Sequence, residues 1–330
     1  MTLDAERGEN QGLLEAVRVR FNRFQVGSAA TIWLAVVALL VIARIVSADF
    51  WSVTHLFNVA RQASALGILA TGQALVLITG GIDLSNGQVV TLVNVVSATM
   101  LDGEDTFLVP VVLLCLAIGA FVGLLNGLII TKLRVPPLVV TLGMLSIVRG
   151  IAYVYTDGAP KGSISPILNF VGSGFVGPVP TAIFFWLVVA VAGTVLLRKT
   201  PLGRYLFALG GNEKASRLSG VRTDLITVVA YVLSGILAAV AGLIISGYIG
   251  TGSLGIGDGR NLDSIAAAVV GGTQLTGGVG SAVGTAGGAV FLALLFSLLR
   301  FVGLPYSNQL MIQGVILAVA AYAHVRSNRT

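Results

Sequence analysis

The feature that most constrains this 330-residue chain is a succession of long apolar segments with almost no charge inside them. A helix that crosses the hydrocarbon core of a bilayer needs about 20 mostly apolar residues. Loops rich in Gly, Pro or charge separate the segments, and residues 86–101 and 261–271 are short for a full crossing. We expect spans at residues 26–48, 56–79, 86–101, 107–131, 136–156, 181–197, 224–247, 261–271, 282–302 and 308–324.

The composition agrees with this pattern. Charged residues make up 10% of the chain, whereas soluble domains carry about 25%. This excludes a disordered chain, and an ordinary soluble enzyme would need a more charged surface. We predict an all-α polytopic membrane protein with about ten transmembrane helices. Residues 26–325 would form the membrane domain, residues 1–25 a tail that is either solvated or a surface helix, and residues 326–330 a second tail.

The positive charges indicate an orientation. If the N-terminus is cytoplasmic, 14 of the 20 basic residues fall in segments on the cytoplasmic side, including the polar loop 198–222. The opposite side, with its long loop 157–180, holds only Lys161 and Arg260. Cytoplasmic loops of membrane proteins carry an excess of Lys and Arg, so both termini are expected inside. This explains the net charge of +6 without nucleic-acid binding.

Two similar glycine-rich segments interrupt the apolar pattern. Residues 80–87 read Gly-Gly-Ile-Asp-Leu-Ser-Asn-Gly, and residues 271–278 read Gly-Gly-Thr-Gln-Leu-Thr-Gly-Gly. Paired short spans with glycine interruptions are typical of transport pathways, although two unrelated turns would look the same. Gly123 and Gly127 lie four residues apart, a spacing that predicts close helix packing.

Polar residues in these breaks are candidates for the substrate pathway, together with Asn126 in the fourth span. For Asp83 we favour helix N-capping over direct substrate contact, since Asp is a preferred N-cap residue. For Asn126 we favour hydrogen bonding between helices over binding a polyol hydroxyl. The candidate pathway residues are Asp83, Ser85, Asn86, Asn126, Gln274 and Thr276.

Two arginines lie in or near the apolar spans. Arg61 is expected to extend its charged end towards the membrane interface. Arg149 lies deeper and needs a partner that local sequence does not identify.

The basic loop 198–222 contains its own helix signals. Asn212 is a good N-cap residue, Glu213 suits the first turn, and Gly220 can end a helix. A short helix over about 213–219 is predicted, which suits docking of a cytoplasmic partner better than a plain surface turn does.

The search for catalytic chemistry is largely negative. The chain has no G-x-x-x-x-G-K-[ST] phosphate loop, no H-E-x-x-H metal motif and no paired-carboxylate site. Its one cysteine, Cys115, excludes an intrachain disulfide and a multi-cysteine metal site. We therefore predict no catalytic residues, no metal and no cofactor, and we disfavour a membrane enzyme.

Four segments together resemble a known family. They are Ile78–Ser85, Gly123–Gly127 with Pro136–Gly143, Gly203–Gly220, and Leu262–Ala267 continuing through Gly271-Gly272. The chain resembles the permease subunits of ATP-binding-cassette importers for ribose, xylose and related sugars. The resemblance implies a bacterial inner-membrane complex. Its partners would be a second permease chain (identical or a paralogue), cytoplasmic ATPase subunits and a periplasmic sugar-binding protein.

The resemblance also assigns roles to the loops. It implies that residues 213–219 form the coupling helix inserted into the ATPase, and that outer loops such as 157–180 receive the binding protein. A secondary transporter or channel that works without an ATPase is the alternative. The implied coupling residues are Gly211, Asn212, Glu213, Ala215, Ser216, Arg217 and Gly220.

Overall fold

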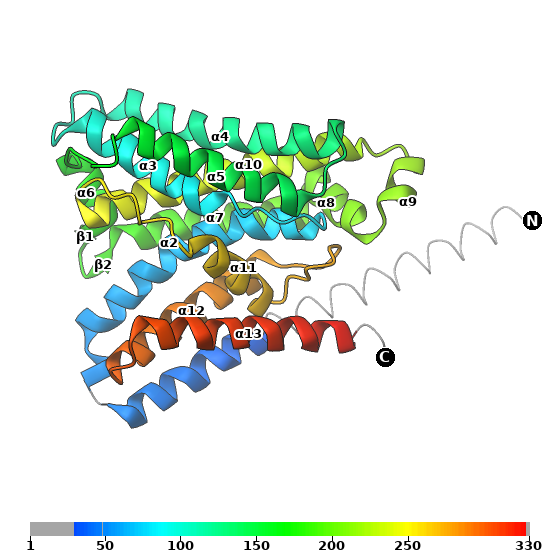
Figure 1. Cartoon of the computed structure of the whole chain (residues 1–330). Helices are drawn as coiled ribbons and strands as arrows, with labels where there is room; N and C mark the ends of the chain where they lie inside the picture. Colours follow the sequence, from blue (N-terminus) through cyan, green and yellow to red (C-terminus); the bar gives the residue numbers. More distant parts are fainter. Residues whose placement is uncertain (1–29, 48, 328–330) are drawn as a thin grey trace, which may run out of the picture.

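The computed structural model describes residues 30–47 and 49–327, and the predicted tail over residues 1–25 lies outside them. The described chain is almost entirely helical (Figure 1). A first helix, Ala30–Val46, precedes the short 3-10 helix η1 (Asp49–Trp51). The long helices are α2 (Val53–Ile78), α3 (Asn86–Leu101), α4 (Leu108–Lys132), α5 (Pro137–Tyr155), α7 (Thr181–Lys199), α10 (Thr223–Ile249), α12 (Ala282–Phe301) and α13 (Tyr306–Ser327). α11 (Arg260–Val270) is short.

The predicted spans agree closely with these helices, because apolar length is a local property of the sequence. Six helices are long and apolar enough to cross a membrane by length and composition: α2, α4, α5, α7, α10 and α12. The two segments predicted as short, now α3 and α11, have 16 and 11 residues. At 1.5 Å per residue they extend only about 24 and 17 Å.

Two predicted loops contain secondary structure that hydropathy alone did not reveal. The loop 157–180 holds α6 (Pro166–Ser173) and a hairpin of β1 (Phe175–Val176) with β2 (Val179–Pro180). The loop 198–222 holds α8 (Pro201–Gly211) before α9 (Glu213–Leu218). Proline at the first helical position starts α8, and the Thr200 side chain accepts a hydrogen bond from the Gly203 N–H at 3.2 Å.

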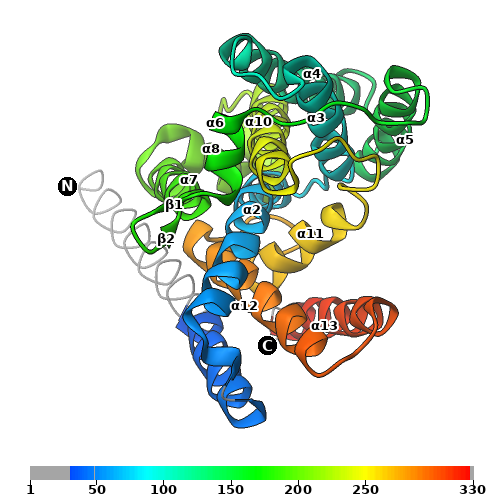
Figure 2. The ribbon, with the colours of Figure 1, turned by 90° about the vertical axis from the view of Figure 1, so that its left-hand side faces the viewer.

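α2 and α10 form the centre of the fold. α10 packs against α4, α2, α3 and α6, and α2 packs against α12, α11 and α7. Viewed along the bundle, α12, α13 and the first helix form one group, and α3 to α10 form a second, larger group (Figure 2). We call the two ends of the bundle the α6 end and the α9 end (Figure 1).

The predicted close packing of small residues is confirmed between α4 and α10. A Cβ atom on Gly119 would collide with the carbonyl oxygen of Gly235, and one on Gly235 would collide with the Gly119 carbonyl. One turn further, a Cβ on Gly123 would collide with the Tyr231 carbonyl. Glycine therefore lets the two backbones touch, which is how helices associate strongly within a bilayer.

Candidate functional site

The first glycine-rich break leaves α2 after Ile78 and starts α3 at Asn86. Asp83, only 1% exposed, is at its centre. One carboxylate oxygen accepts hydrogen bonds from the Ser85 N–H (3.0 Å) and hydroxyl (2.6 Å), and the other accepts from the Ser234 hydroxyl on α10 (2.8 Å). Asp83 thus accepts the Ser85 N–H just before α3. The prediction that Asp83 is the N-cap residue is wrong, because α3 begins at Asn86 and its N-cap residue is Ser85, which makes no capping bond of its own.

Side chains from several helices hold the rest of this break. The Asn126 amide on α4 donates to the Ser85 hydroxyl at 2.9 Å. Hydroxyl groups of Thr141 on α5 and Tyr231 on α10 both donate to the Ile82 carbonyl, at 3.2 and 3.1 Å. Irregular backbone at membrane depth is tolerated only where protein or a water-filled cavity satisfies its polar groups. We call this hydrogen-bonded set around Asp83 the break network.

The start of α3 joins the break network to α2 and α11. The Asn86 amide lies 2.9 Å from the Gln73 amide and 3.2 Å from the Ser264 hydroxyl. With its amide nitrogen turned towards the break, Gln73 also donates to the Asp83 carbonyl oxygen at 2.9 Å. Asn86 therefore connects residues that are far apart in the sequence.

The second break, between α11 and α12, touches the first through backbone. The Gly278 N–H donates to the Ile78 carbonyl at 2.9 Å. Gln274 is 4% exposed, and the exposed Thr276 donates to its side chain at 3.5 Å. The two breaks that resemble each other in sequence are thus neighbours in space, but Gln274 and Thr276 lie outside the break network.

The structure contains two sizeable cavities. The first, of about 700 Å³, lies near the α6 end and is lined by α2, α10, α11, α12, α13 and the loop before α11. The second, of about 620 Å³, lies between α9, α10 and the start of the first break. The Asp83 and Ser85 polar atoms bind backbone and neighbouring side chains, whereas the side-chain oxygens of Asn86 and Asn126 are buried without a hydrogen-bond partner in the described structure. None of the candidate pathway residues lines either cavity. These residues are Asp83, Ser85, Asn86, Asn126, Gln274 and Thr276.

The predicted helix in the basic loop is confirmed as α9. The Asn212 side chain caps it by accepting the Ala215 N–H at 3.0 Å, and Gly220 ends the segment with a φ of +83°, a conformation that glycine adopts without strain. Gly211, Glu213 and Arg217 are exposed, and Ser216 is buried; the Leu218 side chain is 91% exposed.

Arg217 connects α9 to α10, a link that the sequence did not reveal. Its guanidinium contacts Glu213 at 3.1 Å, Thr223 at 2.9 Å and Asp224 at 2.9 Å. Thr223 and Asp224 begin α10, whose later residues Tyr231 and Ser234 reach the break network. The sequence signal for this link was the recurrence of polar residues at helical spacing along α10, which is otherwise largely apolar.

The two intramembrane arginines have partners from distant segments. Arg149 pairs with Asp258 at 3.7 Å. Arg61 does not extend freely towards the interface as expected. It is 9% exposed, donates to the Ser173 carbonyl at 3.1 Å and lies over the Phe175 ring at 5.0 Å. The Arg61 guanidinium is buried because α6 and β1 cover this position.

Among residues 30–47 and 49–327, no group of three His, Cys, Asp or Glu side chains is placed to hold a metal ion. Largely apolar helices around a buried polar break define a polytopic membrane protein of the transport type. The chain belongs to the family described as branched-chain amino acid transport system / permease component, whose sequence model matches residues 55–321.

Individual relatives are named for sugars. The ribose import permease protein RbsC of Escherichia coli K12 is 38% identical over 293 residues, covering 87% of this chain and 91% of the relative. RbsC of Bacillus subtilis is 36% identical over 87% of this chain and 90% of its own length. The galactose/methyl galactoside import permease protein MglC of E. coli K12 is 36% identical, with coverages of 86% and 91%. No solved structure matches the chain.

Proposed function

We propose that this chain is the membrane-spanning permease subunit of an ATP-driven importer for a sugar or sugar-like polyol. The observation that carries the proposal is the 38% identity to a ribose import permease over nearly the full length of both chains. The family description names branched-chain amino acids, whereas the individual relatives, which match nearly the full chain, are named for ribose and galactose. The sequence lacks a phosphate loop, so a separate subunit would hydrolyse ATP.

The proposed membrane topology has about ten spans with both termini in the bacterial cytoplasm. The first helix, α3, α11 and α13 would supply the spans beyond the six long apolar helices. The α9 end would face the cytoplasm, because the basic loop 198–222 is there, and α13 runs towards that end (Figure 1). The α6 end, with the loop 157–180, would face the periplasm and receive a sugar-binding protein.

We propose that α10 transmits movement from the ATPase to the first break. α9 would dock on the ATPase, and Arg217 ties α9 to Asp224 in the first turn of α10. Tyr231 and Ser234, two to three turns along the same helix, hold Ile82 and Asp83. One rigid helix therefore joins the docking surface to the break, and the candidate pathway residues would line the route only when the break moves.

A reconstitution experiment tests this function. The permease is placed in proteoliposomes with an ATPase and a sugar-binding protein from the same organism, and uptake of radiolabelled D-ribose and D-galactose is measured. We expect uptake of at least one sugar that requires ATP and disappears when the phosphate-loop lysine of the ATPase is replaced. Uptake driven by an ion gradient without ATP would instead indicate a secondary transporter, and passive equilibration would indicate a channel.

Replacing Arg217 by alanine should uncouple transport without unfolding the protein. We expect uptake to fall roughly tenfold, the effect of losing about 1.4 kcal/mol of coupling. The melting temperature should change little, because the Arg217 side chain is 53% exposed and exposed ion pairs contribute little to stability. Lys132→Ala, an exposed basic residue at the end of α4, is the control. Normal uptake in Arg217→Ala would contradict the proposed role of α9.

A further inference from the structure

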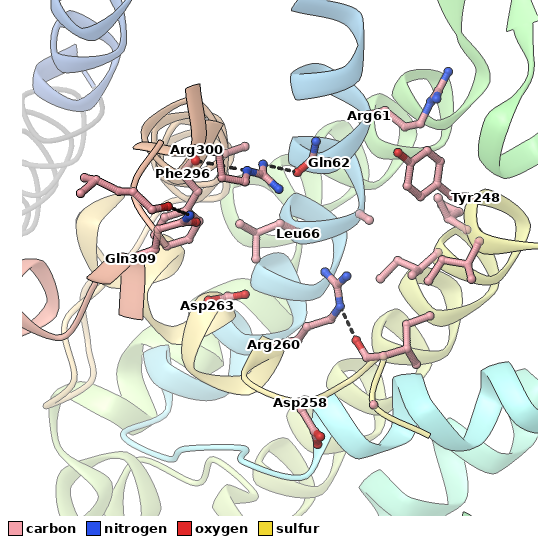
Figure 3. Close-up of a pocket in the computed structure, with 18 residues that line it drawn as sticks. Arg61, Gln62, Leu66, Tyr248, Asp258, Arg260, Asp263, Phe296, Arg300 and Gln309 are labelled. Carbon is pink, nitrogen blue, oxygen red and sulfur yellow. Dashed lines mark hydrogen bonds between the residues drawn. The ribbon is translucent and has the colours of Figure 1, made fainter. Parts of the chain in front are cut away.

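The cavity of about 700 Å³ near the α6 end has a lining unlike that of an ordinary gap between apolar helices (Figure 3). We call it the arginine cavity, after Arg61, Arg260 and Arg300. Its volume lies within the range of small-molecule sites, about 300–1,000 Å³. Its walls come from α2, α10, α11, α12 and α13, and of these α2 and α10 form the centre of the fold.

Arginine and glutamine side chains cross this cavity. The Arg300 guanidinium on α12 donates to the Gln62 side-chain oxygen on α2 at 2.8 Å, joining two walls. Arg61 lines the cavity with the start of its side chain and turns its guanidinium away from the cavity, donating to the Ser173 carbonyl at 3.1 Å (Figure 3).

The opposite wall carries carboxylates that already bind other side chains. Asp263 accepts from Gln313 on α13 at 2.6 Å, and Asp258 accepts from Gln88 at 2.9 Å. The polar groups lie on several sides of the cavity, with the aromatic rings of Tyr248 and Phe296 between them (Figure 3). This arrangement offers both donors and acceptors around a solute, rather than one charged end.

We propose that the arginine cavity binds an uncharged polyhydroxylated solute of aldose size. Each hydroxyl of such a solute both donates and accepts, which matches a mixed lining of guanidinium, amide and carboxylate groups. This proposal rests on the transport function proposed above, to which it adds a binding location and a ligand chemistry.

The cavity also touches the break network through α11. Asp263 lines the cavity, and the adjacent Ser264 lies 3.2 Å from the Asn86 amide at the start of α3. A solute bound beside Asp263 is therefore next to Ser264, whose hydroxyl belongs to the hydrogen bonds at the start of α3. The cavity would hold the solute immediately before the break opens.

Cysteine protection tests the site without an ATPase or a binding protein. In full-length permease with Cys115→Ala, a single cysteine is placed in the cavity wall as Leu66→Cys, and its rate of modification by a small maleimide is measured. D-ribose or D-galactose at about 50 mM should slow the reaction about sixfold, the protection expected for a site with a dissociation constant of about 10 mM. The solutions are matched in osmolality with glycine betaine.

Two controls make the result specific. Ala159→Cys, exposed in the loop near the α6 end and outside the cavity, should show no protection. In the Leu66→Cys background, Arg300→Gln should abolish protection while the melting temperature stays unchanged.

Absence of protection by both sugars, or protection by L-leucine alone, would overturn the proposal. Protection by a sugar combined with ATP-independent uptake would retain the site and reject the ATP-driven function.

Discussion

Replacing Gly119 by alanine is expected to lower the melting temperature of this permease by about 5–10 °C. The added Cβ would collide with the carbonyl oxygen of Gly235 on α10. Because that neighbour is backbone rather than a flexible side chain, the two helices must separate. Overpacking of this kind costs about 1–3 kcal/mol or more, and each kcal/mol corresponds to about 2–4 °C in a larger domain.

A matched substitution isolates the packing effect. Gly150 on α5 is also helical, and a Cβ there would meet nothing within 4 Å. Alanine favours the helix by about 1 kcal/mol at both positions, so only packing distinguishes the two variants.

Cys115 provides the measurement. It is the only cysteine in the chain and is fully buried, so a thiol-reactive fluorogenic dye reports unfolding on heating. Equal melting temperatures for Gly119→Ala and Gly150→Ala would show that α4 and α10 are not in backbone contact.

Replacing Asp83 by alanine is expected to abolish sugar uptake and also to destabilise the protein. The change leaves three buried donors without their acceptor: the Ser85 N–H, the Ser85 hydroxyl and the Ser234 hydroxyl. Each buried unpaired group costs about 1–3 kcal/mol, so the melting temperature should fall by several degrees. Asp83→Asn, which keeps an acceptor oxygen, should have a smaller effect on both measurements.

The control for Asp83→Ala is Glu104→Ala, which removes an exposed acidic side chain from the loop after α3. A double-mutant cycle with Ser234→Ala then tests the bond between α10 and the first break. We expect the double variant to cost about 1 kcal/mol less than the sum of the single variants, because both remove the same interaction.

Two outcomes would contradict these expectations for Asp83. Strict additivity of the two substitutions would show that this hydrogen bond does not hold the break. Lost uptake in Asp83→Ala with an unchanged melting temperature would instead assign Asp83 to direct substrate contact, the role we considered less favoured.

The sequence alone determined the helical class, the approximate span boundaries and α9. These follow from properties of neighbouring residues: apolar length, helix capping and the glycine that ends a segment. The short helices α6 and α8 were missed because they have only 8 and 11 residues, too few for apolar length to distinguish them from loop.

The tertiary structure alone decided which distant residues meet. Ser234 binds Asp83 across 151 residues of sequence, and Arg149 pairs with Asp258 in the loop before α11. It also decided that Asp83, Asn86 and Asn126 hydrogen-bond other parts of the protein, and that the arginine cavity exists at all. Contacts of this kind depend on how helices pack across the bundle. Local hydropathy and capping patterns describe each helix by itself, so they identify the elements of this permease but not its contacts.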